Sequence, residues 1–285
     1  MRKKASLKRV EPSFSALPAN RKEQFKDVLK NQYGLLIRIG LVLFLFLLPL
    51  LACLIAADLF GGALKDGEAS SLNYLYNDLV LDAGLLLSSV VLALGMAGAS
   101  HILRLLCWGE PVLFWSDFKT GVKQNWKKDT LLFSLLALLF AFSNLSSDLL
   151  TVFAPESGAG FILWSVLLGF IVFFALPFVM IGISYNSYYK DSSKRFFSNV
   201  LKILVVRYFP LFLFVLPLFG LIVLYFFTNI IYFAAFVVLL IFLGPVYLSG
   251  WRLFILSKFD ELINSAYLDF YKKGLYLGGP IDEEN

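Results

Sequence analysis

Long apolar runs alternate with short polar segments along most of the chain. A helix needs about 20 apolar residues to cross a hydrocarbon core of about 30 Å, and each run approaches that length. The pattern therefore predicts an all-α polytopic integral membrane protein with six transmembrane helices. Only Thr228 and Asn229 separate the last two runs, so we expect a tight hairpin there. The expected spans are residues 34–57, 83–106, 130–153, 160–185, 208–227 and 230–257.

The segment before the third run combines aromatic residues with lysines. In residues 111–128 the aromatic residues recur three or four positions apart, which places them on one face of a helix. Such an amphipathic helix lies flat at a membrane surface, with its rings at the acyl boundary and its lysines among the lipid phosphates. The interfacial anchors expected from this pattern are Trp115, Phe118, Lys119, Lys123, Trp126 and Lys127.

Similar short amphipathic stretches occur near residue 25, over 192–206 and after residue 258. They suggest three repeats of a cytoplasmic surface helix followed by a membrane hairpin, closed by a fourth surface helix. The alternative is that any amphipathic helix beside a span shows such a match. Asn20 and Glu23 have the spacing of a helix N-cap pair. The chain then divides into a basic tail and first interfacial helix (1–33), a six-span membrane domain (34–257) and a C-terminal amphipathic helix and tail (258–285).

Composition and charge place these spans in lipid. Hydrophobic residues make up 59% of the chain and charged residues 16%, which excludes an ordinary water-soluble domain. The net charge of +5 could suggest nucleic acid, but the basic residues flank apolar runs, so anionic lipids at the cytoplasmic face are the expected partner. Of the 25 lysines and arginines, all except Lys65 fall on one side of the expected spans. The positive-inside rule then places both termini in the cytoplasm.

One group of polar residues falls near the outer ends of the expected spans. Asn144, Ser147 and Asp148 share one face of the third span at positions i, i+3 and i+4, and Asp82 lies near the outer end of the second. Together they could line an outward-facing pocket for a cation or a polyol. The alternative is that they are ordinary residues of the outer interface.

The turn after the second span contains three residues with an expected structural role. Arg104, Gly109 and Glu110 stand where the span meets the surface helix, and an ion pair between Glu110 and Arg104 would set the angle between the two. The only histidine, His101, lies three residues before Arg104. It is either part of a proton relay or an interfacial histidine bonded to a carbonyl or headgroup.

Small residues and prolines interrupt the spans. The stretch Gly95–Ala99 lets another helix approach closely, either in a homodimer or membrane partner or within the same chain. Pro49, Pro177, Pro217 and Pro245 fall inside spans, and the Gly244–Pro245 pair predicts a kink in the sixth.

The sequence contains no motif of known catalytic chemistry. There is no P-loop, HExxH or GxSxG, and no Ser/His or Cys/His pair at one depth. With one histidine, and with Cys53 and Cys107 expected at opposite membrane faces, we predict no metal, no cofactor and no enzymatic activity.

A series of short motifs surrounds the segment from Gly98 to Asp129. They are the small residues Gly95–Ala99, the basic Arg104, the Gly109–Glu110 step, the aromatic-Asp-Phe motif at Trp115, Asp117 and Phe118, and the final motif Asn125–Trp126–Lys127. In these motifs the segment resembles the YesL-like family of bacterial polytopic membrane proteins. The resemblance implies a bacterial cytoplasmic membrane and an association with carbohydrate uptake, but no fixed catalytic or ligand residues.

Two functions follow as expectations. The first is a non-enzymatic accessory or scaffold protein associated with membrane transport, which the surface helices and the missing catalytic motifs favour. The second is a transporter or channel for a small polar or neutral solute, which the kinked spans and the Asn144–Asp148 face favour.

Overall fold

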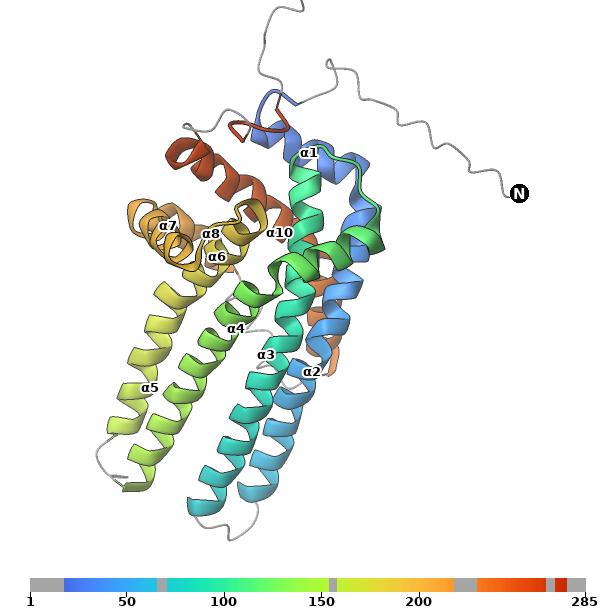
Figure 1. Cartoon of the computed structure of the whole chain (residues 1–285). Coiled ribbons are helices and arrows are strands. Elements are labelled where there is room, and N and C mark those ends of the chain that lie inside the picture. Colours follow the sequence, from blue (N-terminus) through green and yellow to red (C-terminus); the bar gives the residue numbers. More distant parts are fainter. Residues whose placement is uncertain (1–17, 66–70, 154–157, 218–229, 265–269, 276–285) are drawn as a thin grey trace, which may run out of the picture.

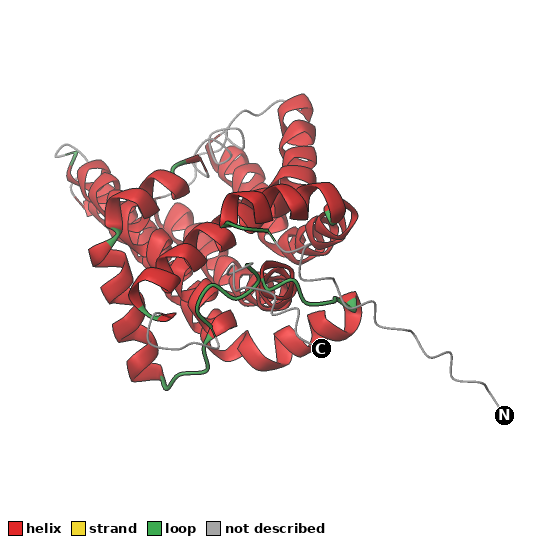
Figure 2. Ribbon diagram, turned by 90° about the horizontal axis from the view of Figure 1, so that it is seen from above, coloured by secondary structure: helices red, strands yellow, loops and turns green. Residues whose placement is uncertain are grey.

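The computed structural model describes residues 18–65, 71–153, 158–217, 230–264 and 270–275, and over these residues the protein is helical with no β-strand (Figures 1 and 2). This confirms the all-α class. In chain order the elements are α1 (Arg21–Asn31), α2 (Tyr33–Lys65), α3 (Ser71–Cys107), α4 (Phe114–Phe153), α5 (Ala159–Phe170), the π-helical η3 (Ile171–Ala175), α6 (Leu176–Tyr188), α7 (Ser193–Val206), α8 (Tyr208–Val215) and α10 (Ile230–Leu262).

Several helices are long and apolar enough to cross a membrane. Within the described part of the chain five qualify, and a sixth is obtained if α7 and α8, which meet at 90°, count as one bent span. The expected fifth span, 208–227, begins with α8, but its second half and the hairpin at Thr228–Asn229 lie outside the described residues. The five qualifying segments are Tyr33–Ala56, Leu75–Cys107, Phe114–Leu150, Ala159–Tyr188 and Ala235–Leu262.

The long helices form a bundle with the short helices gathered at one end. In Figure 1, α2 runs beside α3 and α4 beside α5, while α1, α7 and the C-terminal part of α10 lie at the end shown uppermost. Two buried apolar clusters hold the bundle together. One joins α6, α7, α8 and α10 to the end of α3 and to α4, and the other joins α1, α2, α3 and the start of α4.

α4 joins the expected surface helix (111–128) and the expected third span (130–153) in one continuous helix. It is a single helix of 40 residues, which is about 60 Å long at 1.5 Å per residue and hence about twice the hydrocarbon thickness. Figure 1 shows its first turns crossing the bundle before the helix turns down beside α5. Asp117 caps the start by accepting a hydrogen bond of 2.6 Å from the Leu113 backbone N–H. The polar residues between 111–128 and the third span therefore do not end the helix.

The termini of the described chain agree in part with expectation. Asn20 caps α1 by accepting a hydrogen bond of 2.9 Å from the Glu23 backbone N–H, as the spacing predicted. At the other end, α10 continues unbroken from its apolar part to Leu262, so the expected fourth surface helix does not begin as a separate element. Residues 265–269 of that expected surface helix lie outside the described residues.

The small residues of α3 pack against neighbours within the chain. A β-carbon at Gly95 would lie 2.6 Å from Phe46 of α2, and one at Gly98 would lie 2.5 Å from the ring of Phe118 in α4. A β-carbon at Gly121 of α4 would overlap His101 of α3. Contacts between α2, α3 and α4 thus account for these residues without a dimer.

Pro177 follows the π-helical turn η3 and frees a backbone carbonyl. A proline has no N–H for the carbonyl four residues earlier, which here belongs to Phe173. The Tyr208 hydroxyl donates to that carbonyl at 3.1 Å and so links α8 to the span formed by α5, η3 and α6. α2 and α10 also continue through prolines, Pro49 and Pro245.

Candidate functional site

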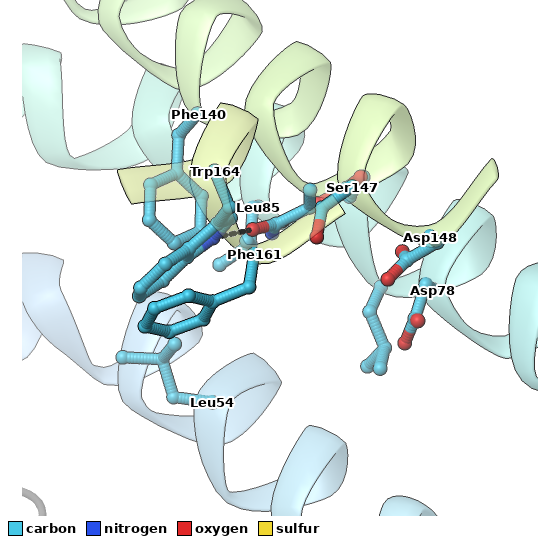
Figure 3. A pocket seen from close by; sticks show the side chains of 11 residues that line it. Leu54, Asp78, Leu85, Phe140, Ser147, Asp148, Phe161 and Trp164 are labelled. Atoms are coloured by element: carbon cyan, nitrogen blue, oxygen red, sulfur yellow. Dashed lines mark hydrogen bonds between the residues drawn. The ribbon is translucent and has the colours of Figure 1, made fainter. Parts of the chain in front are cut away.

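A pocket of about 470 Å³ lies between α2, α3, α4 and α5 (Figure 3). All four residues of the expected outer polar site line it, which places Asp82 on α3 beside Asn144, Ser147 and Asp148 on α4. The packing of α3 on α4 brings the four residues together. The remaining lining residues are Leu54, Asp78, Leu81, Leu85, Phe140, Phe161 and Trp164.

A chain of hydrogen bonds orients Asn144 within the pocket. The Trp164 indole N–H, which is only a donor, gives a hydrogen bond of 3.1 Å to Asn144 Oδ1. The Asn144 amide N–H₂ is thereby directed towards Asp82 Oδ1, at 3.4 Å. Asp82 is 7% exposed. The indole thus fixes an amide donor beside a buried carboxyl group.

The second half of the pocket carries two neighbouring carboxyl groups. Figure 3 shows the side chains of Asp78 and Asp148 beside one another, and Asp148 Oδ2 is buried with no hydrogen-bond partner among the described residues. Among the described residues, three aspartates and no lysine or arginine line the pocket. The pocket therefore favours cationic or hydroxyl-bearing solutes and disfavours anions.

Asp78 and Trp164 complete the site but were not among the expected site residues. Asp78 lies four residues before Asp82 and hence on the same face of α3. This spacing of four residues could have predicted from the sequence that Asp78 belongs to the site. Trp164 lies on α5, and nothing in its local sequence links it to Asn144, so only the packing of α5 on α4 reveals it.

The turn after α3 has a structural role, but with a different ion pair. Gly109 adopts a φ of 69°, and the Glu110 backbone N–H bonds the Leu105 carbonyl at 2.9 Å, as in a Schellman cap. Glu110 Oε1 accepts from Lys273 Nζ at 2.9 Å, so the expected pair with Arg104 is not formed. Arg104 instead donates to the Ser187 carbonyl at 3.0 Å. The turn therefore holds the segment after α10 against α3.

The same end of the bundle ties α1 to α10. Arg21 forms an ion pair of 2.8 Å with Asp260, and both side chains are largely buried. Asn264 Nδ2 donates to Asp260 Oδ1 at 2.8 Å, and Asn264 Oδ1 accepts a hydrogen bond from the Tyr189 hydroxyl. Burial raises the pKa of Tyr189, so the phenol stays a neutral donor.

The expected interfacial anchors divide into two sets. Trp115 is 63% exposed and Trp126 is 43% exposed, and the three lysines Lys119, Lys123 and Lys127 are also exposed. Phe118 differs from the expectation because it is buried. Its ring occupies the space that Gly98 leaves on α3, so it anchors α4 to α3 and not to lipid.

A buried polar network that was not among the expected sites lies on the α1 side of the bundle. Arg252 of α10 is only 2% exposed. Its guanidinium donates to Ser187 Oγ at 2.5 Å, to the Ser184 carbonyl at 3.3 Å and to Ser100 Oγ. The sequence could have predicted this network, because an arginine within an apolar run and serines in two other spans are unusual in a lipid-exposed position.

Asp129 of α4 lies fully buried near this network. Asn186 Nδ2 donates to Asp129 Oδ1 at 2.8 Å, and Asp129 Oδ2 has no hydrogen-bond partner in the described part of the chain. His101 is also buried, with no partner for Nδ1 among the described residues. Neither expected role of His101, relay or interfacial, is established by its contacts.

Comparison of the chain with protein-family models, with curated proteins and with solved structures finds no match. The resemblance to the YesL-like family stays a prediction. Among the described residues, no group of three or more His, Cys, Asp and Glu side chains is arranged to hold a metal ion.

Proposed function

We propose that the protein is a non-enzymatic multi-pass membrane protein that binds a small polar solute in the pocket between α2, α3, α4 and α5 and takes part in its transport. The observation that carries the proposal is the convergence of Asp78, Asp82, Asn144 and Asp148 on one pocket of about 470 Å³. Polar groups that converge in a concave site between helices of a bundle are typical of a ligand pocket.

The chemistry of the lining narrows the solute class. Three carboxyl groups attract a cation or accept hydrogen bonds from hydroxyl groups, and the Asn144 amide is one of the few donors that the pocket offers. Phe140, Phe161 and Trp164 supply aromatic surface for a sugar ring or a quaternary ammonium group. A polyol or a small organic cation therefore fits better than an anion.

The arrangement in the membrane is also a proposal. We infer six spans, both termini in the cytoplasm of a bacterium and the pocket on the outer side. The basic residues around α1, α7 and the end of α10 support this orientation, because these elements lie at the opposite end of the bundle from the start of α3 and the end of α4 (Figure 1). Asp78 and Asp148 belong to those two segments. The threefold repeat of surface helix and hairpin remains part of the same proposal.

A second candidate function is an accessory protein that binds the solute without moving it. The Arg252 network favours this candidate, because its buried hydrogen bonds hold α3, α6 and α10 together. Transport and accessory function therefore differ in a measurable way, namely whether binding is accompanied by flux.

Substitutions in the pocket test the proposed site. In lipid discs, we expect choline or glucose to bind and sodium glutamate not to bind. Asp148→Ala and Asn144→Ala should each weaken binding about tenfold, since each removes a polar or charge-assisted contact. Tryptophan fluorescence measures binding, and uptake of the same labelled solute into proteoliposomes measures flux.

The matched control is Asp27→Ala, which removes an exposed carboxyl group from α1 outside the pocket. It should bind like the unsubstituted protein. Equal affinities for the pocket variants and the control would contradict the proposed site. Binding without flux would favour the accessory role.

Single-cysteine labelling tests the proposed orientation. In a chain with Cys53 and Cys107 replaced by serine, a cysteine at Lys123 should be protected from an impermeant thiol reagent in intact cells. A cysteine at Gly158, in the α4–α5 connection, should react. Both positions are exposed, so protection reports the side of the membrane and not burial. Labelling of both cysteines in intact cells would overturn the orientation.

A further inference from the structure

A second concave site lies on the outside of the bundle, where the first turns of α4 cross α3. It is a groove of about 400 Å³ that is separate from the solute pocket. Its floor and walls are mostly apolar, and two lysines border it. The lining residues are Leu94, Phe118, Lys119, Val122, Lys123 and Trp126.

The shape of the groove is set by packing between α3 and α4. Phe118 is held against Gly98 and lies with its ring centroid 5.8 Å from that of Phe46. It therefore forms a fixed floor. Leu94 of α3 forms one side, while Trp126, which is 43% exposed, stands at the end of the groove. An apolar chain could lie here without displacing any side chain from the core.

The charge beside the groove is not balanced by the protein. Lys119 and Lys123 are exposed and one helical turn apart, and Lys127 continues the same row. No carboxylate lies within ion-pair distance of these lysines among the residues described. Like charges at i and i+4 repel one another, so an anion placed between them would be stabilised by both.

We propose that this groove binds one anionic phospholipid, with the phosphate between Lys119 and Lys123 and an acyl chain along Leu94 and Val122. The apolar floor beside two unpaired cations matches the two parts of a phospholipid, whereas a soluble anion would leave the apolar surface unused. A partly exposed tryptophan beside the headgroup position is characteristic of membrane interfaces. The inference goes beyond a general attraction to lipid, because it assigns one saturable site, and it does not depend on the solute pocket.

Native mass spectrometry of the full chain in mild detergent tests the proposal. With dioleoylphosphatidylglycerol as the probe, we expect one lipid to be retained in preference to dioleoylphosphatidylcholine. Lys119→Ala combined with Lys123→Ala should weaken phosphatidylglycerol binding about tenfold or more, since each lysine near an anionic lipid contributes roughly a factor of five. Leu94→Trp, which fills the groove and keeps both lysines, should weaken it as well.

The matched control is Lys194→Ala combined with Lys202→Ala, which removes two exposed lysines from α7 and leaves the groove intact. It changes the net charge by the same amount and should keep the preferred lipid. Three outcomes would overturn the proposal: equal losses in the two double variants, equal retention of the two lipids, or a protein dimer that the Lys119/Lys123 variant dissociates. Solute binding by the same preparations is read separately, so failure of one proposal does not imply failure of the other.

Discussion

Replacing Arg252 with alanine is expected to lower the free energy of unfolding by about 3 kcal/mol or more. The side chain is almost fully buried and donates hydrogen bonds to Ser100, Ser184 and Ser187 on two other helices. Alanine leaves a cavity and unsatisfied acceptors, and it removes a positive charge near the buried Asp129. Each of these changes costs free energy on its own. The effect is measured by heating both proteins in detergent and recording the fraction that stays monodisperse at each temperature.

Arg207→Ala is the control for the loss of an arginine. Arg207 pairs with Glu261 at 2.9 Å, but both side chains are about 40% exposed. A surface ion pair contributes roughly 0–1 kcal/mol. We therefore expect a change within 1 kcal/mol for Arg207→Ala, and the interpretation of Arg252 would be wrong if the two variants lost equal stability.

Gly40→Ala is expected to destabilise the protein by about 3 kcal/mol, which corresponds to roughly 5–10 °C in the apparent melting temperature. A β-carbon at Gly40 of α2 would overlap the Ile241 carbonyl oxygen of α10 and lie 2.9 Å from Pro245 Cγ. The backbone oxygen cannot move aside as a flexible side chain could. Pro245 explains the close approach, since it lacks the N–H that would otherwise bond the Ile241 carbonyl.

Gly244→Ala provides a matched substitution in α10, one residue before the same proline. A β-carbon at Gly244 would meet no atom within 4 Å, and alanine favours a helix by about 1 kcal/mol over glycine in an exposed position. We expect unchanged or slightly higher thermal stability. A melting temperature for Gly40→Ala equal to that of Gly244→Ala would show that α2 and α10 separate easily.

The two polar clusters of the bundle differ in the ionisable side chains that they contain. Among the described residues, three aspartates and no lysine or arginine line the pocket between α2, α3, α4 and α5, whereas the network on the α1 side includes the buried Arg252 and the neighbouring Arg104. A cationic solute would therefore be attracted to the pocket and repelled by the network. A neutral polyol would find hydrogen-bonding groups in both clusters. Whether the bound solute is a cation or a neutral polyol therefore bears on whether it can pass the network.

The sequence by itself determined the helical class, the positions of most apolar spans and one face of the pocket. These properties depend on local regularities. About 20 apolar residues define a span, and the 3.6-residue period of a helix brings Asn144, Ser147 and Asp148 to one side. The capping of α1 by Asn20 was predictable for the same reason, because its partner is three residues away.

Only the tertiary structure decided which helices face one another. Trp164 orients Asn144 by a hydrogen bond, and Glu110 pairs with Lys273 in place of Arg104. The acceptors for Arg252 lie on α3 and α6. The continuity of α4 through its polar segment belongs here as well, since burial of Asp129 and Asn125 between helices keeps these residues helical. Such contacts join residues far apart in the chain, and they depend on where glycines allow close packing, which no local pattern of apolar and polar residues records.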